Sequence, residues 1–429
     1  MDSYQYLIIG GGIAGVTAAE TIREQDPDAT IGIVSHEAYP LYSRVLLPSH
    51  LKRKIPREKL FLRTGDDFIA NRIELRLQET VTAIDAKRRE VTLRNGATLG
   101  YAKLLIASGG RVKPWGRPED ESVIYRLQTL DDADRLFDAL GSIKNPLVIG
   151  SSFISLEFLE IFLLNGLTPG LLMRDEHFFA SYLEKIGGEL MRAHFQRHHI
   201  TLYEHDEVAQ VRRAAPGSSQ IGTQEGRARI DLTVLTKKQQ VIPCDALAVG
   251  VGIERNLAFI DRSNILRGNV GIRVNEFLET GQESIYAAGD VAEVLDPVTG
   301  TYRATGNWTS AFLEGKHAGL NMSGMRVPFT NIPSYSITNL GMQITVVGEC
   351  LPTADLPKGD ADTIVRVDTD KNEYERLFLV EGSLRGAVLI NRFKDRAHLI
   401  RLIETHQKLD AYQDRLSSFQ FDITTIPVI

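Results

Sequence analysis

The chain has 429 residues, a formal net charge of −6 at pH 7, and an ordinary composition of 43% hydrophobic and 24% charged residues. Its length exceeds what a single hydrophobic core supports and suggests about three domains. The acidic balance predicts that no nucleic acid is bound, because there is no basic surplus to displace phosphate counterions.

Neither a membrane span nor a sulfur-based site is expected. The sequence has no run of about 18 apolar residues. A buried strand expected at residues 6–9 leaves no room for a cleavable leader, which favours a cytoplasmic location. Cys244 and Cys350 are far apart and lack a C-x-x-C partner, so we predict no disulfide framework and no metal site.

The strand at residues 6–9 runs into a glycine-rich turn and a helix start of small residues. The expected cofactor contacts in this turn are Gly10, Gly12, Ile13, Ala14 and Gly15. In the spacing G-x-G-x-x-G, the first glycine permits the tight turn and the second lets a pyrophosphate approach the backbone. The third lets the helix pack closely on the strand, with the diphosphate at the helix N-terminus. The motif therefore predicts a dinucleotide.

A second apolar strand, residues 30–34, is followed by His36 and Glu37. A carboxylate about 20 residues past the last glycine is expected to bind the ribose of the dinucleotide. Glu37 is therefore the predicted ribose ligand, with His36 its nearest competitor. Further strands are expected at residues 73–77, 81–84, 90–93 and 101–106, with a hairpin turn at Asn95-Gly96.

A second strand–turn–helix unit begins at Leu147, and such self-similarity predicts a second dinucleotide-binding domain. Gly150 keeps the first position of its fingerprint, but Ser152 and Ser155 replace the other two glycines. Ser152 adds a side chain where a pyrophosphate must touch the backbone.

The next strand leads to Arg174-Asp175, where an NAD site usually ends in Glu. Arg174 could receive a 2′-phosphate and favour NADPH, but the degraded turn equally suggests a vestigial site. Phe153, Glu157 and Gly252 are the other candidate residues of this second site.

The last third of the chain changes character. A strand ends in Gly289-Asp290, and a helix with small residues is expected at residues 308–322. Past Pro328 short strands precede a helix at about residues 394–408, which suggests an α+β domain. The polar stretch at residues 214–227 is expected to be a hairpin tip.

Together these motifs resemble the FAD-dependent pyridine nucleotide-disulfide oxidoreductases. The likeness rests on the first fingerprint with Glu37, the strand end at residues 106–110, and residues 280–290. It implies an α/β fold with two dinucleotide-binding (Rossmann-like) domains and a C-terminal α+β domain that forms a homodimer. The implied boundaries are 1–112 with 253–327 for a discontinuous FAD domain, 113–252 for the second, and 328–429 for the third.

The resemblance also implies roles for individual residues. Asp290 would bind the flavin ribityl and phosphate, and Arg44 would pair with the phosphates or stack on the rings. The other implied FAD contacts are Val81, Ala107, Ser108, Gly109, Gly289 and Trp308.

Within the family, residues 42–48 look most like the rubredoxin reductases, ferredoxin reductases and nitrite reductase flavoproteins. Ser49 stands where many of these relatives have Lys, which leaves a lysine–glutamate pair beside the flavin in doubt. The C-x4-C pair of disulfide reductases is missing, and Val45 and Leu46 stand where related enzymes carry a reactive cysteine. Reduction through a protein sulfur is therefore not expected.

We predict a soluble FAD oxidoreductase that passes electrons from NAD(P)H or another donor through the flavin to a separate acceptor, such as a small redox protein. The alternative is a flavoprotein subunit reduced by ferredoxin or a partner enzyme, with the second nucleotide domain vestigial. A third hypothesis is a non-catalytic interaction protein that keeps FAD for stability.

Overall fold

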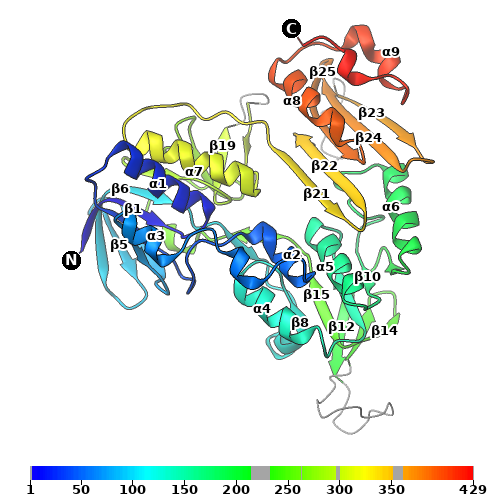
Figure 1. Ribbon diagram of the computed structural model, residues 1–429, viewed down its shortest axis with the longest axis horizontal. Coiled ribbons are helices and arrows are strands. Elements are labelled where there is room, and N and C mark those ends of the chain that lie inside the picture. Colours follow the sequence, from blue (N-terminus) through cyan, green and yellow to red (C-terminus); the bar gives the residue numbers. More distant parts are fainter. Residues whose placement is uncertain (1, 214–231, 262, 296–299, 351–360, 429) are drawn as a thin grey trace. The chain divides into compact units, whose positions relative to one another are not determined.

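The computed structural model describes residues 2–213, 232–261, 263–295, 300–350 and 361–428, so the expected hairpin tip at 214–227 lies outside them. In these ranges the chain forms two compact units (Figure 1). The first unit comprises Met1–Leu46, Pro56–Arg111 and Ile253–Pro333, and the second comprises Leu47–Ile55, Val112–Gly252 and Ser334–Ile429. The three-domain boundaries given above stay a prediction beside this division.

The first unit is built on a parallel sheet in the order β3-β2-β1-β6-β18. Its strands are β1 (Ser3–Ile9), β2 (Ile31–Val34), β3 (Ile73–Arg76), β6 (Thr98–Ile106) and β18 (Ile285–Ala287). Ile8 lies between Ile33 and Leu105 at the centre of the sheet, and all three are fully buried. Such continuous apolar runs are typical of strands covered on both faces.

Helices α1 (Ile13–Gln25) and α7 (Trp308–Met322) pack against each other along small residues (Figure 1). A Cβ on Gly315 would lie 2.3 Å from the carbonyl oxygen of Ala14, and one on Gly319 would lie 2.8 Å from that of Ala18. Only glycine allows this approach of the two backbones. The bounds of α7 match the predicted helix.

Strand β6 is longer than predicted because its first residues pair antiparallel with β5 (Glu90–Leu93), which pairs with β4 (Val81–Asp85). Gly96 turns this hairpin with a φ of +86°, as predicted for Asn95-Gly96. The first unit also contains α3 (Gly65–Ala70), β16 (Ile253–Arg255), β17 (Ile272–Val274), β19 (Ala292–Leu295) and β20 (Tyr302–Arg303). Strand β7 (Gly110–Val112) ends one residue past the limit of this unit at Arg111.

The second unit repeats the strand–turn–helix pattern in a parallel sheet with the order β11-β10-β9-β15-β8. Its strands are β8 (Ile124–Tyr125), β9 (Pro146–Ile149), β10 (Gly170–Leu172), β11 (Thr201–Tyr203) and β15 (Ala246–Val249). The accompanying helices are α2 (Leu47–Leu51), α4 (Leu130–Ala139), α5 (Phe153–Leu164) and α6 (Lys185–Arg197). An antiparallel sheet follows β11 with strands β12 (Val208–Arg213), β13 (Leu232–Thr236) and β14 (Val241–Cys244).

The C-terminal part of the second unit is an antiparallel sheet in the order β21-β22-β25-β24-β23. Its elements are β21 (Ser334–Asn339), β22 (Met342–Gly348), β23 (Ala361–Asp368), β24 (Glu373–Val380), β25 (Ser383–Ile390), α8 (Arg396–Glu404) and α9 (Gln413–Leu416). Helix α8 is shorter than predicted, because a 3-10 turn at Phe393–Asp395 precedes it and His406 adopts a left-handed φ of +52° after it. No helix within the described ranges is long and apolar enough to cross a membrane.

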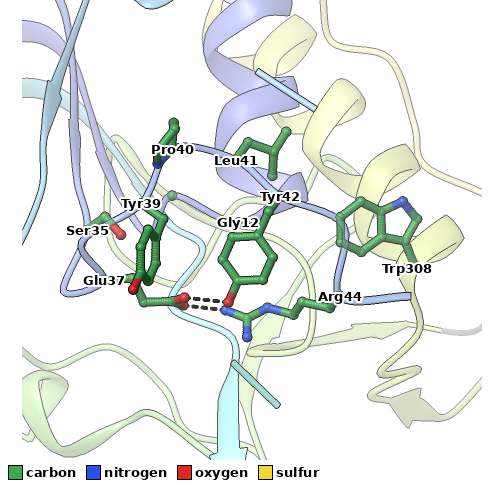
Figure 2. Close-up of a pocket in the computed structure, with 10 residues that line it drawn as sticks. Gly12, Ser35, Glu37, Tyr39, Pro40, Leu41, Tyr42, Arg44 and Trp308 are labelled. Atoms are coloured by element: carbon green, nitrogen blue, oxygen red, sulfur yellow. Dashed lines mark hydrogen bonds and ion pairs between the residues drawn. The ribbon is translucent and has the colours of Figure 1, made fainter. Parts of the chain in front are cut away.

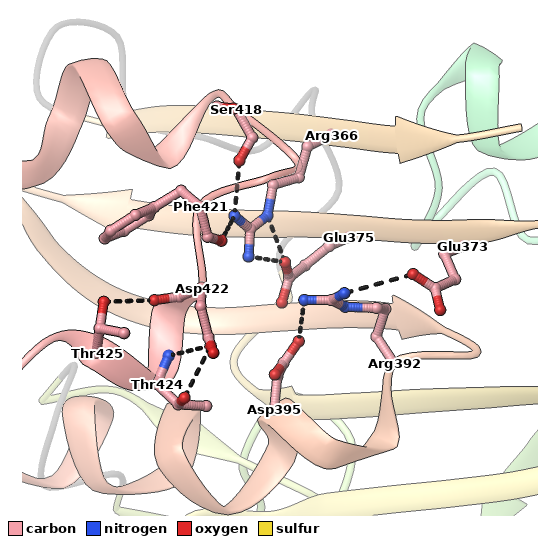
Figure 3. Close-up of polar contacts among 10 residues, drawn as sticks. All are labelled: Arg366, Glu373, Glu375, Arg392, Asp395, Ser418, Phe421, Asp422, Thr424 and Thr425. Carbon is pink, nitrogen blue, oxygen red and sulfur yellow. Dashed lines mark hydrogen bonds and ion pairs between the residues drawn. The ribbon is translucent and has the colours of Figure 1, made fainter. Parts of the chain in front are cut away.

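A buried charge cluster ties the last part of the chain to this sheet (Figure 3). The side chains of Arg366 and Glu375 are completely buried and form an ion pair. Arg366 also donates to the carbonyl oxygens of Ser418 at 3.1 Å and Phe421 at 2.9 Å. The charge on Arg366 thus serves two purposes, since it neutralises Glu375 and anchors the segment after α9.

Candidate cofactor sites

In the first glycine fingerprint, two glycines are required by the fold and one leaves space for a ligand. Gly10 has a φ of +121°, and a Cβ there would lie 2.1 Å from the carbonyl oxygen of Ala107. A Cβ on Gly15 would lie 2.0 Å from the carbonyl oxygen of Gly10. A Cβ on Gly12 would meet no described protein atom within 4 Å. The fold therefore needs the outer glycines, whereas Gly12 leaves the backbone open to a ligand.

Gly12 lines a recess in the first unit (Figure 2). The sequence-predicted residues that line it are Gly12, Glu37, Arg44 and Trp308. The lining residues that sequence reasoning missed are Gly11, Ser35, Tyr39, Pro40, Leu41 and Tyr42. His36 is exposed and is not among the lining residues, so the geometry favours Glu37 over its competitor.

Glu37 is held by two neighbours across the recess (Figure 2). The hydroxyl of Tyr42 donates to its Oε2 at 2.5 Å, and the guanidinium of Arg44 forms an ion pair with its Oε1. Burial opposes the charge on Arg44, but Glu37 raises the pKa of the guanidinium above its ordinary value. Both oxygens of Glu37 have protein partners, so ribose hydroxyls would have to replace one of them.

The Gly289-Asp290 turn reaches the same region from far along the sequence. Gly289 has a φ of +78°, and a Cβ there would lie 3.0 Å from the Cβ of Ala14 in α1. Burial raises the pKa of Asp290, and the positive charges of Arg255 and Arg44 oppose this shift. The acidic turn therefore lies at the start of α1, within electrostatic range of the arginine that binds Glu37.

The other predicted FAD contacts belong to the same unit but lie outside the residues that line the recess. Ala107 contacts Gly10, as described above. The main-chain oxygen of Ser108 accepts a hydrogen bond from Asn256 Nδ2 at 2.9 Å. Gly109 has a φ of +61°, and Val81 is buried at the start of β4.

These residues fit FAD. A diphosphate suits the open backbone at Gly12, the N-terminus of α1 and the cation of Arg44, while carboxylates at Glu37 and Asp290 suit sugar hydroxyls. When bound, FAD supplies a ring that accepts a hydride and releases single electrons. Sequence reasoning missed Arg255 and Glu314 near this site. One sign of Glu314 was present in the sequence, because this acidic residue directly precedes Gly315, one of the small residues of the predicted helix.

The second fingerprint, in the second unit, keeps the turn but changes the helix start. Gly150 has a φ of +107°, and a Cβ there would lie 2.5 Å from the carbonyl oxygen of Gly250. The hydroxyl of Ser152 accepts a hydrogen bond from the N–H of Ser155 at 3.3 Å and caps α5. Ser155 is fully buried against Gly250. The capping hydroxyl therefore occupies an N–H group of the kind that a phosphate would bind.

Aromatic rings gather at the start of α5. The ring of Phe153 lies 4.5 Å from that of Phe179, 4.8 Å from that of Tyr335 and 5.9 Å from that of Tyr182, between centroids. One turn into the helix, burial raises the pKa of Glu157 to about 7. Glu160 adds to this shift and Lys52 opposes it.

The second unit contains a buried lysine–glutamate pair, at positions other than Ser49. Lys52 forms an ion pair with Glu160 and donates to Asn339 Oδ1 at 2.7 Å. Lys52 follows Ser49 by three residues, and Glu160 follows Glu157 by three residues.

Arg174 and Asp175 differ in their relation to the second fingerprint. Asp175 accepts a hydrogen bond from the hydroxyl of Ser151, inside the glycine-type turn. The side chain of Arg174 is 78% exposed and lies 3.5 Å from Asp175. Gly252, at the end of the same sheet, has a φ of +88°. Asp175, rather than Arg174, is therefore hydrogen-bonded to the turn of the second fingerprint.

Comparison with known proteins finds relatives over nearly the whole chain. The family described as pyridine nucleotide-disulphide oxidoreductase matches residues 4–315, and the rubredoxin NAD+ reductase C-terminal domain matches residues 333–407. The NADH-dependent phenylglyoxylate dehydrogenase subunit epsilon of Aromatoleum evansii is 25% identical over 420 residues, which cover 97% of this chain and 95% of the relative. The 3-phenylpropionate/cinnamic acid dioxygenase ferredoxin–NAD(+) reductase component of Photorhabdus laumondii is 26% identical over 406 residues, which cover 94% and 97%.

Solved structures share the fold. A chain of the covalent putidaredoxin reductase–putidaredoxin complex matches with a TM-score of 0.86 and 21% identity, over 98% of this chain and 97% of that chain. The ferredoxin reductase for the CYP199A2 system from Rhodopseudomonas palustris matches with a TM-score of 0.84 and 22% identity, over 99% of both chains.

Proposed function

The chain belongs to the pyridine nucleotide-disulphide oxidoreductase family, and from this premise we propose that it carries electrons from a reduced nicotinamide nucleotide through FAD to a separate redox protein. The family match and the relatives confirm the predicted α/β architecture and the predicted class, an FAD-dependent oxidoreductase. Two relatives are named as a reductase component and as a subunit of larger systems, which supports an acceptor on another protein.

The observation that carries this proposal is the combination of an FAD-type recess with unreactive sulfur. The two cysteines of the chain are Cys244 and Cys350. Burial raises the pKa of each thiol to about 12, so neither forms a thiolate at neutral pH. Since no protein sulfur can take the electrons from the flavin, they must leave to an external acceptor.

Anaerobic titration of the purified FAD-loaded protein tests the proposal. We expect NADH or NADPH to bleach the visible absorption band of the oxidised flavin, and a small iron–sulfur protein to restore it. Reduction of the flavin by dithionite alone would contradict a nicotinamide donor. A flavin that is reduced by NAD(P)H but reoxidised by no protein acceptor would contradict the external acceptor.

The second candidate is a flavoprotein subunit that a partner protein reduces, with a vestigial nucleotide site. The capping bond between Ser152 and the N–H of Ser155 favours it, because that N–H is withheld from a phosphate. In the same titration, this candidate predicts reduction by a reduced iron–sulfur protein and none by either nicotinamide nucleotide.

Replacing Ser152 with glycine is expected to tighten binding of the nicotinamide nucleotide by about tenfold, because it frees one N–H for a charge-assisted hydrogen bond. The helix should lose only a few tenths of a kcal/mol on this change. The KM for NADH, with ferricyanide as acceptor, measures the effect. Thr129→Gly removes the same kind of cap from α4 and serves as the control, which should leave this KM unchanged.

An unchanged or higher KM for S152G would mean that no phosphate approaches the start of α5, and would favour the vestigial site. The homodimer, the cytoplasmic location and the individual FAD and NAD(P) contacts stay predictions.

A further inference from the structure

A buried carboxyl group stands behind the Gly289-Asp290 turn, and nothing in the electron-transfer scheme above uses it. Glu314 lies in α7 and is 2% exposed. Its Oε2 accepts a hydrogen bond from the backbone N–H of Gly289 at 2.7 Å. Its Oε1 lies 3.4 Å from the hydroxyl of Thr305. The carboxyl group is therefore bonded directly to the backbone of the turn that carries Asp290.

Glu314 also lines a second, small recess in the first unit. Arg303, Thr305 and Asn331 supply polar groups to its wall, and Phe329 supplies an aromatic one. Val294 and Leu295 complete the wall with apolar side chains. Glu314 thus separates this recess from the Gly289-Asp290 turn.

We propose that Glu314 is a positioning residue of the FAD site, which holds the Gly289-Asp290 turn as a neutral carboxylic acid and so makes FAD affinity depend on pH. A neutral group is required for a simple electrostatic reason. Asp290 already places a carboxylate at the site, and the FAD diphosphate is anionic, so a further negative charge behind the turn would oppose binding.

The charges around Glu314 agree with this role. Burial raises the pKa of Glu314 to about 8, and Asp290 adds to the shift. The hydrogen bonds from Gly289 and Thr305 and the positive charge of Arg303 oppose it. From its own helix, His317 faces Phe329 and bonds the carbonyl oxygen of Leu313. Helix α1 presents Ala14, Ala18 and Thr21 to the glycines of α7, and none of these three ionises.

The direction of the pH effect follows from linkage. Below about pH 8 Glu314 is protonated with or without FAD, so affinity is constant. Above this pH the carboxyl group ionises in the free protein, while the anionic cofactor keeps it protonated in the complex. Binding must then take up a proton, and affinity falls as pH rises.

Titration of the full-length apoprotein with FAD between about pH 6.5 and about pH 9.5 tests this inference, with quenching of flavin fluorescence as the readout. We expect the Kd of the wild type to rise about tenfold over this range, which corresponds to a difference of about one pKa unit between free and bound states. Glu314→Gln should bind FAD with a nearly flat profile. Glu283→Gln makes the same chemical change at an exposed site and should keep the wild-type profile.

Arg303→Gln provides a second test that does not depend on the folding of E314Q. Loss of the positive charge should raise the pKa of Glu314 further and move the onset of the affinity loss to higher pH. A flat wild-type profile, an unchanged profile in E314Q, or an onset unmoved in R303Q would each overturn the inference. The inference rests on the FAD site at Gly289 and Asp290, and all three results leave FAD binding itself intact, so failure here is distinguishable from failure of that site.

Discussion

A valine in place of Gly12 is expected to weaken FAD binding by about 100-fold and leave the fold intact. A Cβ at this position would meet no described protein atom within 4 Å, so the side chain enters the recess without a clash in the protein. It would stand where the diphosphate reaches the backbone and the N-terminus of α1. Losing two charge-assisted hydrogen bonds of about 1.5 kcal/mol each weakens binding by about 100-fold.

The measurement is FAD content after purification, followed by titration of the apoprotein with FAD. Far-UV circular dichroism should show the wild-type fold, because a non-glycine cap on α1 costs only about 1 kcal/mol. Gly65→Val introduces the same side chain at the first residue of α3, where a Cβ also has open space, and should retain FAD. Wild-type FAD affinity in G12V would show that the cofactor does not approach this turn.

The space around each glycine predicts different effects for substitutions at Gly12 and at Gly15. A side chain on Gly15 would collide with the carbonyl oxygen of Gly10 at 2.0 Å, so G15V is expected to lose the fold together with the cofactor. The comparison explains why a sequence motif alone is ambiguous. Both glycines belong to one pattern, but only the structure shows which serves the fold and which leaves space for the ligand.

Much of the fold was predictable because its signals are local. The run Leu7-Ile8-Ile9 and the glycines after it specify a buried parallel strand and a tight turn within a few residues. The small residues Gly315 and Gly319 marked α7 for close packing. Helix ends were less well predicted, and α8 is the example, since its limits depend on a 3-10 turn and on one left-handed residue, His406.

The geometry of the sites depends on contacts between distant segments, which local patterns do not encode. Spacing identified Glu37, but not its bonds to Tyr42 and Arg44. Matching at Ser49 left a lysine–glutamate pair in doubt, and it gave no sign of the ion pair that Lys52 and Glu160 form.

Replacing Glu375 with leucine is expected to destabilise the C-terminal sheet by about 3–5 kcal/mol, because it leaves the buried Arg366 charged and without its ion-pair partner. An arginine side chain stays positively charged inside folded proteins, so the cost cannot be avoided by loss of the charge. Its remaining bonds, to the carbonyl oxygens of Ser418 and Phe421, are to neutral groups. Denaturant unfolding measures the loss, and hydrogen exchange of amides in β23 and β24 assigns it to this sheet.

A double-mutant cycle separates charge from packing in this prediction. The double variant R366M/E375L should be more stable than E375L alone, because methionine removes the unpaired cation from the interior. A double variant no more stable than E375L would mean that lost packing, rather than the orphaned charge, causes the destabilisation. Arg89→Met breaks an ion pair that is exposed on both sides, and is expected to leave the unfolding midpoint unchanged. The two ion pairs differ in their exposure to water. Water can replace the lost partner of the exposed Glu283, but it cannot reach the buried guanidinium of Arg366.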